Sequence, residues 1–376
     1  MRNVYLSAEN IITPLGFTTG DNAITMLEGR SGIRLITDEK ISPVPFYASL
    51  IDPESLDNRF SSIGEADKYS RFEKMAICSI KETVSSAAVD LTGSRTLFIL
   101  STTKGNIDLL ENNSFDKRLY LWNTARLLQR QFNFRNEPLV ISDACISGVQ
   151  AIITGARLIR AGLYDNCVIN GTDIISEFVL SGFNSFKSLS TGPCRPFDKT
   201  RDGLSLGEGS GTIILTSGPD ASGNDKILVS EGFSTNDANH ISGPSRTGEG
   251  LFIAISRVLQ KSSPKIDFIS AHGTATPYND EMESVAINRA GLQDVPVNSF
   301  KGYWGHTLGA AGVIESIMSI YSIRNNILFN TLGFSVPGVT NPLNIVSVPV
   351  KKEINNCLKI ASGFGGCNAA VLFYRK

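Results

Sequence analysis

One stretch, residues 140–156, organises the chain and reads Val-Ile-Ser-Asp-Ala-Cys-Ile-Ser-Gly-Val-Gln-Ala-Ile-Ile-Thr-Gly-Ala. A short apolar strand breaks at Cys145, and from Val149 onward apolar residues recur at the i, i+3, i+4, i+7 spacing of a helix. The sequence therefore predicts a strand–turn–helix unit with Cys145 at or near the helix N-terminus.

That position suggests a chemical role for Cys145. Unpaired backbone N–H groups and the helix dipole favour an anion there, which is expected to lower the pKa of the thiol and make it a nucleophile. The alternative is a buried cysteine that behaves as a small hydrophobe, and we expect this for most of the other five. The strand–turn–helix setting favours the nucleophile without settling the choice.

Length and charge limit the function classes. A chain of 376 residues exceeds one typical core, so two domains or two fused halves are expected. With 19% charged residues and a net charge of -1, the chain has no overall electrostatic field that would favour binding to nucleic acid. An acidic partner would need a local basic patch.

Other features point to an ordinary cytosolic protein. The N-terminus lacks the apolar region of a signal peptide, and no stretch approaches the length of a membrane span, so we expect a cytoplasmic location and no membrane partner. Six cysteines occur without a Cys-x-x-Cys pair. This favours free thiols over a zinc site or a disulfide framework.

The first half has the pattern of an α/β unit. A helix is predicted over 70–88, and the continuous apolar run at 96–100 predicts a strand covered on both faces. A polar, helical excursion over 105–135 leads back to the strand before Cys145. Residues 31–65 are predicted to be irregular.

The second half repeats this pattern. Residues 219–225 read as a linker, which divides the chain into halves at 1–225 and 226–376. Buried strands are predicted at 268–270 and 295–298, each followed by a glycine-containing segment. Two copies of one α/β unit suggest fused halves facing each other across a pseudo-twofold axis, with the site where the strand ends meet.

Two of the three histidines lie where such a site would form. His272 and His306 follow predicted strands in glycine-rich turns, and His306 holds roughly the place in the second half that Cys145 holds in the first. A functional role is favoured for both. His240 is more simply a partly buried structural residue. Metal ligation is disfavoured because the acidic residues near His272 do not make a recognised ligand spacing.

Two glycine-rich segments are candidate binding loops. The turn 363–366, Gly-Phe-Gly-Gly, offers backbone N–H groups suited to an oxyanion hole, although a tight hairpin would look the same. The span 194–211 superficially suggests a phosphate loop. No strand precedes it and no Gly-Lys-Ser/Thr follows, so the nucleotide interpretation is rejected.

Taken together, motifs spread over nearly the whole chain carry a resemblance to a known family. They are Thr-Pro-Leu-Gly at 13–16, Gly-Arg-Ser-Gly-Ile at 29–33, the turn at Cys145, Arg-Pro-Phe-Asp-Lys-Thr-Arg-Asp-Gly at 195–203, Ala-His-Gly-Thr-Ala-Thr-Pro at 271–277, Lys301 with Gly-His-Thr-Leu-Gly-Ala-Ala-Gly at 305–312, and Gly-Phe-Gly-Gly at 363–366. The chain resembles the β-ketoacyl-acyl carrier protein synthases, elongating condensing enzymes of the thiolase-fold superfamily. The resemblance implies two pseudo-symmetric βαβαβαββ halves in α-β-α-β-α layers.

The resemblance also implies a two-stage reaction without a cofactor or metal. Cys145 would accept an acyl group, with the backbone N–H groups of Cys145 and Phe364 as the oxyanion hole. His272 and His306 would bind the malonyl thioester oxygen during decarboxylation, which makes this a decarboxylative Claisen condensation in fatty acid or polyketide synthesis. Lys301 would support the histidines.

Further roles follow from the same resemblance. Lys301 would pair with Glu283, Asp280 would support the site, and Phe364 would gate the acyl pocket. Substrate contacts are expected from Phe364, Thr274, Thr276 and Ile146.

Three positions depart from the family pattern. Asp143 and Ile146 replace smaller residues beside the cysteine, which would narrow the pocket. Cys367 replaces a threonine after the glycine turn and could loosen a hydrogen bond near the gate. Chain length is therefore the property that the resemblance transfers least.

The implied partners are acyl carrier protein and a second subunit. Because the carrier is acidic in this family, docking must use local positive charge, and the candidates are Lys68, Arg71 and Arg201. A homodimer, or a heterodimer with a related subunit, is expected.

Two alternatives remain at this stage. A degradative thiolase has a second catalytic cysteine near its C-terminus, for which Cys367 is a candidate, although it falls at the family's threonine position. A non-catalytic partner subunit would help to set chain length, but such subunits usually lack the cysteine, and Cys145 is present.

Overall fold

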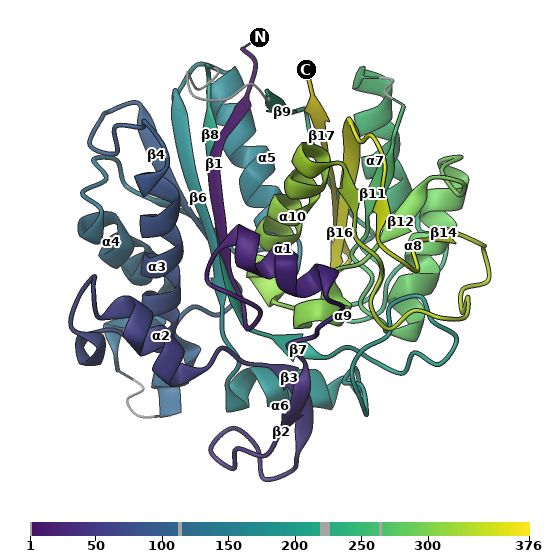
Figure 1. Ribbon diagram of the computed structural model, residues 1–376, viewed down its shortest axis with the longest axis horizontal. Helices are drawn as coiled ribbons and strands as arrows, with labels where there is room; N and C mark the ends of the chain where they lie inside the picture. The colour runs from purple at the N-terminus through teal and green to yellow at the C-terminus, as the bar shows by residue number, and fades with distance from the viewer. Residues whose placement is uncertain (1, 112–114, 219–225, 263–264) are drawn as a thin grey trace.

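The computed structural model describes residues 2–111, 115–218, 226–262 and 265–376. Helices and strands alternate in five layers, with helices outside, strands next and a pair of helices in the middle (Figure 1). Within the described residues, twelve strands form one hydrogen-bonded sheet. Both chain ends lie at the same edge of the molecule.

Five strands of the first half set its topology. They are β1 (Tyr5–Ile12), β4 (Thr96–Ser101), β5 (Leu139–Ile141), β6 (Asn166–Asp173) and β8 (Gly209–Thr216). Their order is β5-β4-β6-β8-β1. Strands β5, β4 and β6 run parallel, whereas β8 is antiparallel to both β6 and β1.

The second half repeats this order and these directions. Its strands are β9 (Ile227–Val229), β10 (Phe233–Asn236), β11 (Phe268–Ser270), β12 (Pro296–Asn298), β14 (Asn344–Ile345), β16 (Asn356–Gly363) and β17 (Cys367–Arg375). Strands β12, β11 and β16 run parallel, and β17 is antiparallel to β16, β9 and β10. The expected architecture of two equivalent α/β halves is confirmed.

Helices cover both faces of each half. The outer helices are α3 (Arg71–Ser85) and α4 (Leu121–Gln131) on the first half and α7 (Glu249–Ser262) and α8 (Pro277–Arg289) on the second; the central pair is α5 (Ser147–Arg160) and α10 (Ala311–Asn325). The central helices touch at Gly148 and Gly312, where a side chain on either would collide with the backbone of the other helix. Glycine at both positions therefore lets the two halves close on each other.

Several shorter elements connect these strands and helices. They are α1 (Thr19–Leu27), α6 (Glu177–Ser185), α9 (Lys301–Trp304), β7 (Leu206–Gly207), β13 (Ile327–Leu328) and β15 (Val350–Lys351). No helix of the described ranges is both long enough and apolar enough to cross a membrane.

The prediction of irregular structure over 31–65 is wrong. The segment contains β2 (Arg34–Ile36), β3 (Phe46–Ser49) and α2 (Pro53–Phe60). Strand β3 pairs with the distant β7, a contact that no local pattern reveals. Helix α2 had a local signature, since Asp52 caps it and Pro53 occupies its first turn.

One boundary stays a prediction. The predicted linker 219–225 lies outside the described residues, so the division at 225/226 is not tested.

Candidate active site

Three side chains from both halves meet at the centre of the molecule. Cys145 follows β5, His272 follows β11, and His306 lies in the segment between α9 and α10. Their sulfur and ring nitrogen atoms lie within 4.8 Å of one another, and all three residues are buried. The two imidazole rings are nearly perpendicular, at 84°, with centroids 5.0 Å apart. The structure thus brings together the three residues singled out in the sequence.

Each of the three turns holds an alanine or leucine in a conformation that favours glycine. Ala144 has φ 44°, Ala275 has φ 64° and Leu308 has φ 53°. For a residue other than glycine, this left-handed backbone conformation is roughly 1–2 kcal/mol less favourable than an ordinary one. Backbone strain is therefore concentrated next to the three reactive side chains, as is common at functional sites.

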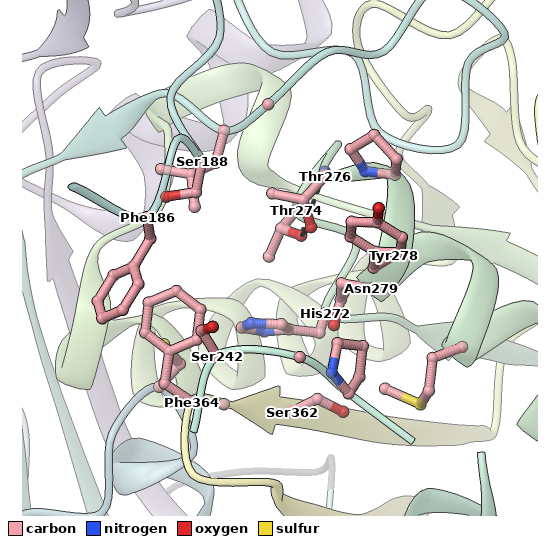
Figure 2. A pocket seen from close by; sticks show the side chains of 18 of the residues that line it. Phe186, Ser188, Ser242, His272, Thr274, Thr276, Tyr278, Asn279, Ser362 and Phe364 are labelled. Atoms are coloured by element: carbon pink, nitrogen blue, oxygen red, sulfur yellow. Dashed lines mark hydrogen bonds between the residues drawn. The ribbon is translucent and has the colours of Figure 1, made fainter. Parts of the chain in front are cut away.

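A pocket of about 400 Å³ opens onto the three side chains. Phe186 and Phe364 line one side of it, and Thr274, Thr276 and Tyr278 line the other (Figure 2). The Thr274 and Thr276 hydroxyls lie 2.8 Å apart. The pocket therefore has an aromatic side and a side lined by hydroxyl groups. This arrangement suits an elongated substrate with polar groups along one side.

The expected lowering of the Cys145 pKa is wrong. Burial raises the pKa of this thiol to about 11 and outweighs the opposing effects of the Lys301 ammonium and the Phe364 N–H. The thiol is 7% exposed. Cys145 is therefore protonated at neutral pH, and its proton must leave as the sulfur attacks.

This protonation state predicts a pH dependence. We expect the rate of Cys145 alkylation by iodoacetamide to rise about tenfold per pH unit from about pH 7 to 9, because the thiolate fraction grows tenfold per unit below the pKa. The measurement is mass spectrometry of the Cys145 peptide after timed quenching. A plateau in this range would show a lowered pKa and contradict the assignment.

Hydrogen bonds fix which nitrogen of each imidazole carries the proton. The Lys301 ammonium lies 3.2 Å from Nδ1 of His272, and the backbone N–H of Leu308 donates to Nδ1 of His306 at 3.3 Å. An ammonium and a backbone N–H group can only donate, so Nδ1 accepts in both rings and Nε2 carries the hydrogen. Burial, reinforced by Lys301, lowers the pKa of both histidines well below the usual value, so both are neutral donors.

These tautomers argue against metal binding by the same residues. Within the described part of the chain, Cys145, His272 and His306 are the one group of three close enough to hold an ion. A metal at Nε2 would require that nitrogen to lose its hydrogen, which would move to Nδ1 and displace the Lys301 and Leu308 donors. A buried lysine beside the group adds repulsion.

The predicted ion pair of Lys301 with Glu283 is wrong. Lys301 is fully buried and forms an ion pair with Glu315 of α10, with 2.6 Å between Nζ and Oε1. Its Nζ also donates to the backbone oxygen of His272 at 2.6 Å. The acidic partner thus comes from the central helix.

Glu283 and Asp280 instead hold the backbone of the His272 turn. Glu283 accepts from the N–H groups of His272 and Gly273, both at 2.7 Å, and Asp280 accepts from Thr274 at 3.0 Å. Burial, together with nearby Asp280, raises the pKa of Glu283 to about 7. Both carboxylates lie on α8, outside the pocket lining, so they fix the turn from behind.

Phe364 lies in an aromatic cluster at the pocket. Its ring centroid is 5.5 Å from that of Phe183 and 5.1 Å from that of Phe186, both on or next to α6. The backbone N–H of Phe364 approaches the Cys145 thiol closely enough to oppose the rise in its pKa. One residue thus contributes both a ring at the wall and an N–H at the sulfur.

The three departures from the family pattern lie off the pocket lining. Ile146 is fully buried in the central core, so its predicted contact with substrate is not what the structure shows. The Asp143 side chain is exposed. The Cys367 thiol points to the carbonyl oxygens of Phe364 and Asp143, at 3.4 and 3.7 Å.

Two of the three predicted docking residues are already engaged. Arg71 pairs with Glu208 and also donates to the Ile51 carbonyl. The side chain of Arg201 is only 9% exposed and donates to the Gly338 carbonyl at 2.6 Å. Neither is a free surface charge, and their assignment to docking stays a prediction.

Lys68 is different, since its side chain is 64% exposed and, among the described residues, forms an ion pair with Glu65 alone, three residues away. Exposed pairs of this kind contribute little to stability and are easily exchanged for another partner.

Sequence reasoning missed Glu315 and Lys359. Each is a charged residue in a buried element: Glu315 on α10, which is buried on nearly all sides, and Lys359 on β16. A lone charge within an apolar run is costly unless paired, so these two residues carried a recognisable signal. Phe183 was also missed, and the sequence gives no comparable signal for it.

Comparison with known proteins gives a consistent result. Residues 1–221 match the model of the β-ketoacyl synthase N-terminal domain, and residues 227–335 match that of the C-terminal domain. A Schizosaccharomyces pombe protein named putative mitochondrial 3-oxoacyl-[acyl-carrier-protein] synthase is 28% identical over 99% of both chains. The Vibrio harveyi 3-oxoacyl-[acyl-carrier-protein] synthase 2 is 27% identical over 99% of this chain and 98% of its own.

A solved structure agrees in fold. The ketosynthase ApeO in complex with its chain length factor ApeC, from Xenorhabdus doucetiae, has a TM-score of 0.86 and 27% identity, covering 100% of this chain and 98% of its own.

Proposed function

The chain belongs to the β-ketoacyl synthase family, and from that premise we propose that it is a 3-oxoacyl-acyl carrier protein synthase, which condenses an enzyme-bound acyl group with a malonyl thioester. The observation that carries this proposal is that the Cys145 thiol and the Nε2–H donors of His272 and His306 lie together at one pocket. The names of the relatives support the same chemistry. The reaction class is acyl transfer with loss of carbon dioxide.

In the first stage Cys145 becomes acylated. Its sulfur attacks the thioester carbonyl of an acyl carrier, the carbonyl oxygen gains negative charge, and the carrier leaves as its thiol with the proton from Cys145. The backbone N–H groups of Phe364 and Cys145 stabilise that oxygen. The high pKa of the resting thiol means that these donors act mainly on the transition state.

In the second stage the two histidines act on malonyl thioester. Cleavage of the bond to the carboxylate releases carbon dioxide and leaves the electron pair as an enolate. The Nε2–H groups of His272 and His306 donate to the enolate oxygen. The carbanion then attacks the acyl carbonyl on Cys145, which forms the new carbon–carbon bond and returns the sulfur as leaving group.

Lys301 supports this stage in two ways. Its contact with Nδ1 keeps the hydrogen of His272 on Nε2, where the enolate oxygen needs it. Its positive charge also keeps the pKa of both histidines low, so that they donate as neutral rings. Asp280 and Glu283 hold the turn, while Thr274, Thr276 and the Phe364 gate contact the substrate.

The partners belong to the same proposal. Acyl carrier protein delivers both thioesters, and Lys68 remains as its docking candidate. A second copy, or a related subunit, is proposed to pair at β5, which is the edge strand of its half and exposes Leu139. The ApeO ketosynthase was solved with a chain length factor. A cytoplasmic location remains a proposal, since one relative is named as mitochondrial.

The alternatives are less well supported. A thiolase would need Cys367 at the substrate, whereas its thiol faces two backbone oxygens and does not line the pocket. A non-catalytic subunit has no need of a complete trio of Cys145, His272 and His306, and here the three reactive side chains converge.

Acylation of the protein tests the proposal directly. After incubation with acyl carrier thioesters of several chain lengths, intact-mass spectrometry should show one acyl group added, and peptide mapping should place it on Cys145. Coenzyme A thioesters run in parallel measure the carrier preference. No adduct with any chain length would contradict the catalytic role and favour a non-catalytic subunit.

A further inference from the structure

Lys359 is a fully buried lysine for which the mechanism above has no role. It lies on β16 within the otherwise uncharged run Cys-Leu-Lys-Ile-Ala at 357–361. Its Nζ donates to Oε2 of Glu315 at 2.5 Å and to the carbonyl oxygens of Ala271 and Ser270 at 3.2 and 3.4 Å. Three acceptors match the three hydrogens of an ammonium. Burial lowers the pKa of Lys359, and the Glu315 carboxylate opposes this change and favours the charged form.

Lys301 has an equivalent set of contacts. Its three acceptors are Oε1 of Glu315 and the carbonyl oxygen and Nδ1 of His272. The two ammonium groups therefore share one carboxylate and bind the carbonyls of three successive residues, 270–272. Two cations and one anion leave this buried group with a net charge of +1.

We propose that Lys359 is a positioning residue for the condensation reaction, acting through Glu315 to hold Lys301 against His272 and to leave a positive charge beside the pocket. This inference rests on the proposed function. Glu315 alone with Lys301 would form a neutral pair. With Lys359 added, the excess charge favours the enolate, which is the species that carries negative charge during the reaction.

The charged and titratable groups around the histidines come from several elements. They are Lys301 of α9, Glu315 of α10, Lys359 of β16, Asp280 and Glu283 of α8, Cys145 before α5 and Asp173 of β6. Among them Lys301 and Lys359 both lower the pKa of His272 and His306. Loss of Lys359 should therefore raise both pKa values.

The effect of Lys359 on the histidines is electrostatic. Because the pKa of His272 lies well below its usual value, a rise after the loss of Lys359 still leaves the ring neutral at neutral pH. What changes for the reaction is the positive charge beside the pocket and the contact of Glu315 with Lys301.

The test uses Lys359→Met in the full-length protein and histidine-labelled NMR. The chain has three histidines, so their ring signals can be followed separately while pH is varied. The third, His240, is exposed and not partly buried as predicted, and it lines the same pocket. We expect the titration midpoints of His272 and His306 to rise by roughly one unit, because the Lys359 charge lowers both pKa values and the loss of a nearby unit charge at an effective dielectric constant of ~20 has an effect of that order. We also expect kcat for condensation to fall about tenfold with KM unchanged.

A neighbouring variant separates charge from packing. Cys357 is also buried and lies two residues earlier on β16, so Cys357→Ala perturbs the same strand without changing charge. It should lower the melting temperature and leave both histidine midpoints where they are. Equal midpoints in wild type and Lys359→Met, with the variant folded, would overturn the proposal.

A second variant and a readout independent of turnover complete the test. If Lys359→Met does not fold, Lys359→Gln retains hydrogen bonding without charge, and the same midpoint shift is expected from it; its absence would overturn the proposal. The NMR readout needs no turnover. Failure of the wild type to condense substrates would count against the proposed function, whereas unmoved histidine midpoints would count against the role of Lys359.

Discussion

Cys145→Ala is expected to abolish condensation, with at least a thousand-fold loss of kcat/KM. The loss follows from the geometry, because Cys145 supplies the sulfur at the centre of the pocket and the other described cysteines lie elsewhere or face backbone oxygens. The assay is product formation from acyl and malonyl carrier thioesters. The fold should survive, since removing one sulfur beside an existing pocket leaves little new cavity.

The matched control for this variant is Cys78→Ala. Cys78 is a buried thiol on α3 in the outer core of the first half, so its removal changes packing to a similar extent but not the site. Its activity should remain within about threefold of wild type. Condensation that persists in Cys145→Ala at a comparable level would mean that Cys145 is not the nucleophile.

Cys145→Gln is expected to separate the two stages of the reaction. Acyl transfer should stop because the sulfur is gone, whereas malonyl decarboxylation should continue because His272 and His306 keep their Nε2–H donors. The glutamine amide can occupy the position of the acyl thioester. Carbon dioxide released from malonyl carrier thioester is the measurement.

Adding His272→Ala to Cys145→Gln should then remove most of the decarboxylation. Loss of one donor to a developing oxyanion typically costs about a hundredfold to a thousandfold. Cys145→Gln with Cys78→Ala serves as the control double variant and should behave like Cys145→Gln alone. If carbon dioxide release were the same with and without His272, the enolate would not be held by this pair.

The sequence predicted the repeated α/β pattern well because buried strands and amphipathic helices leave local periodic signatures. It missed β2 and β3. Strand β2 pairs with β3, and β3 in turn pairs with β7, which lies more than 150 residues away. Helix α2 was missed although Asp52 and Pro53 mark its start.

The reactive residues could be found in the sequence because all three lie in turns of small residues, and Cys145 and His272 directly follow strands. Their pKa values and ion-pair partners could not be found in the same way. A helix N-terminus favours a thiolate, yet burial at the junction of two halves has the larger effect and raises the pKa of Cys145 to about 11. Likewise, Glu283 is the acidic residue suggested by the motif, but the partner of Lys301 comes from α10.

The sequence by itself determined which elements form and which residues stand at their ends, because periodicity, glycine and proline act within a few residues. Only the tertiary structure decided how the two halves close at Gly148 and Gly312, which brings α10 and β16 behind the histidines. That closure sets the hydrogen positions on His272 and His306 and the pairing of Lys301, Glu315 and Lys359. These properties depend on burial and on charges far apart in the chain, for which no local pattern exists.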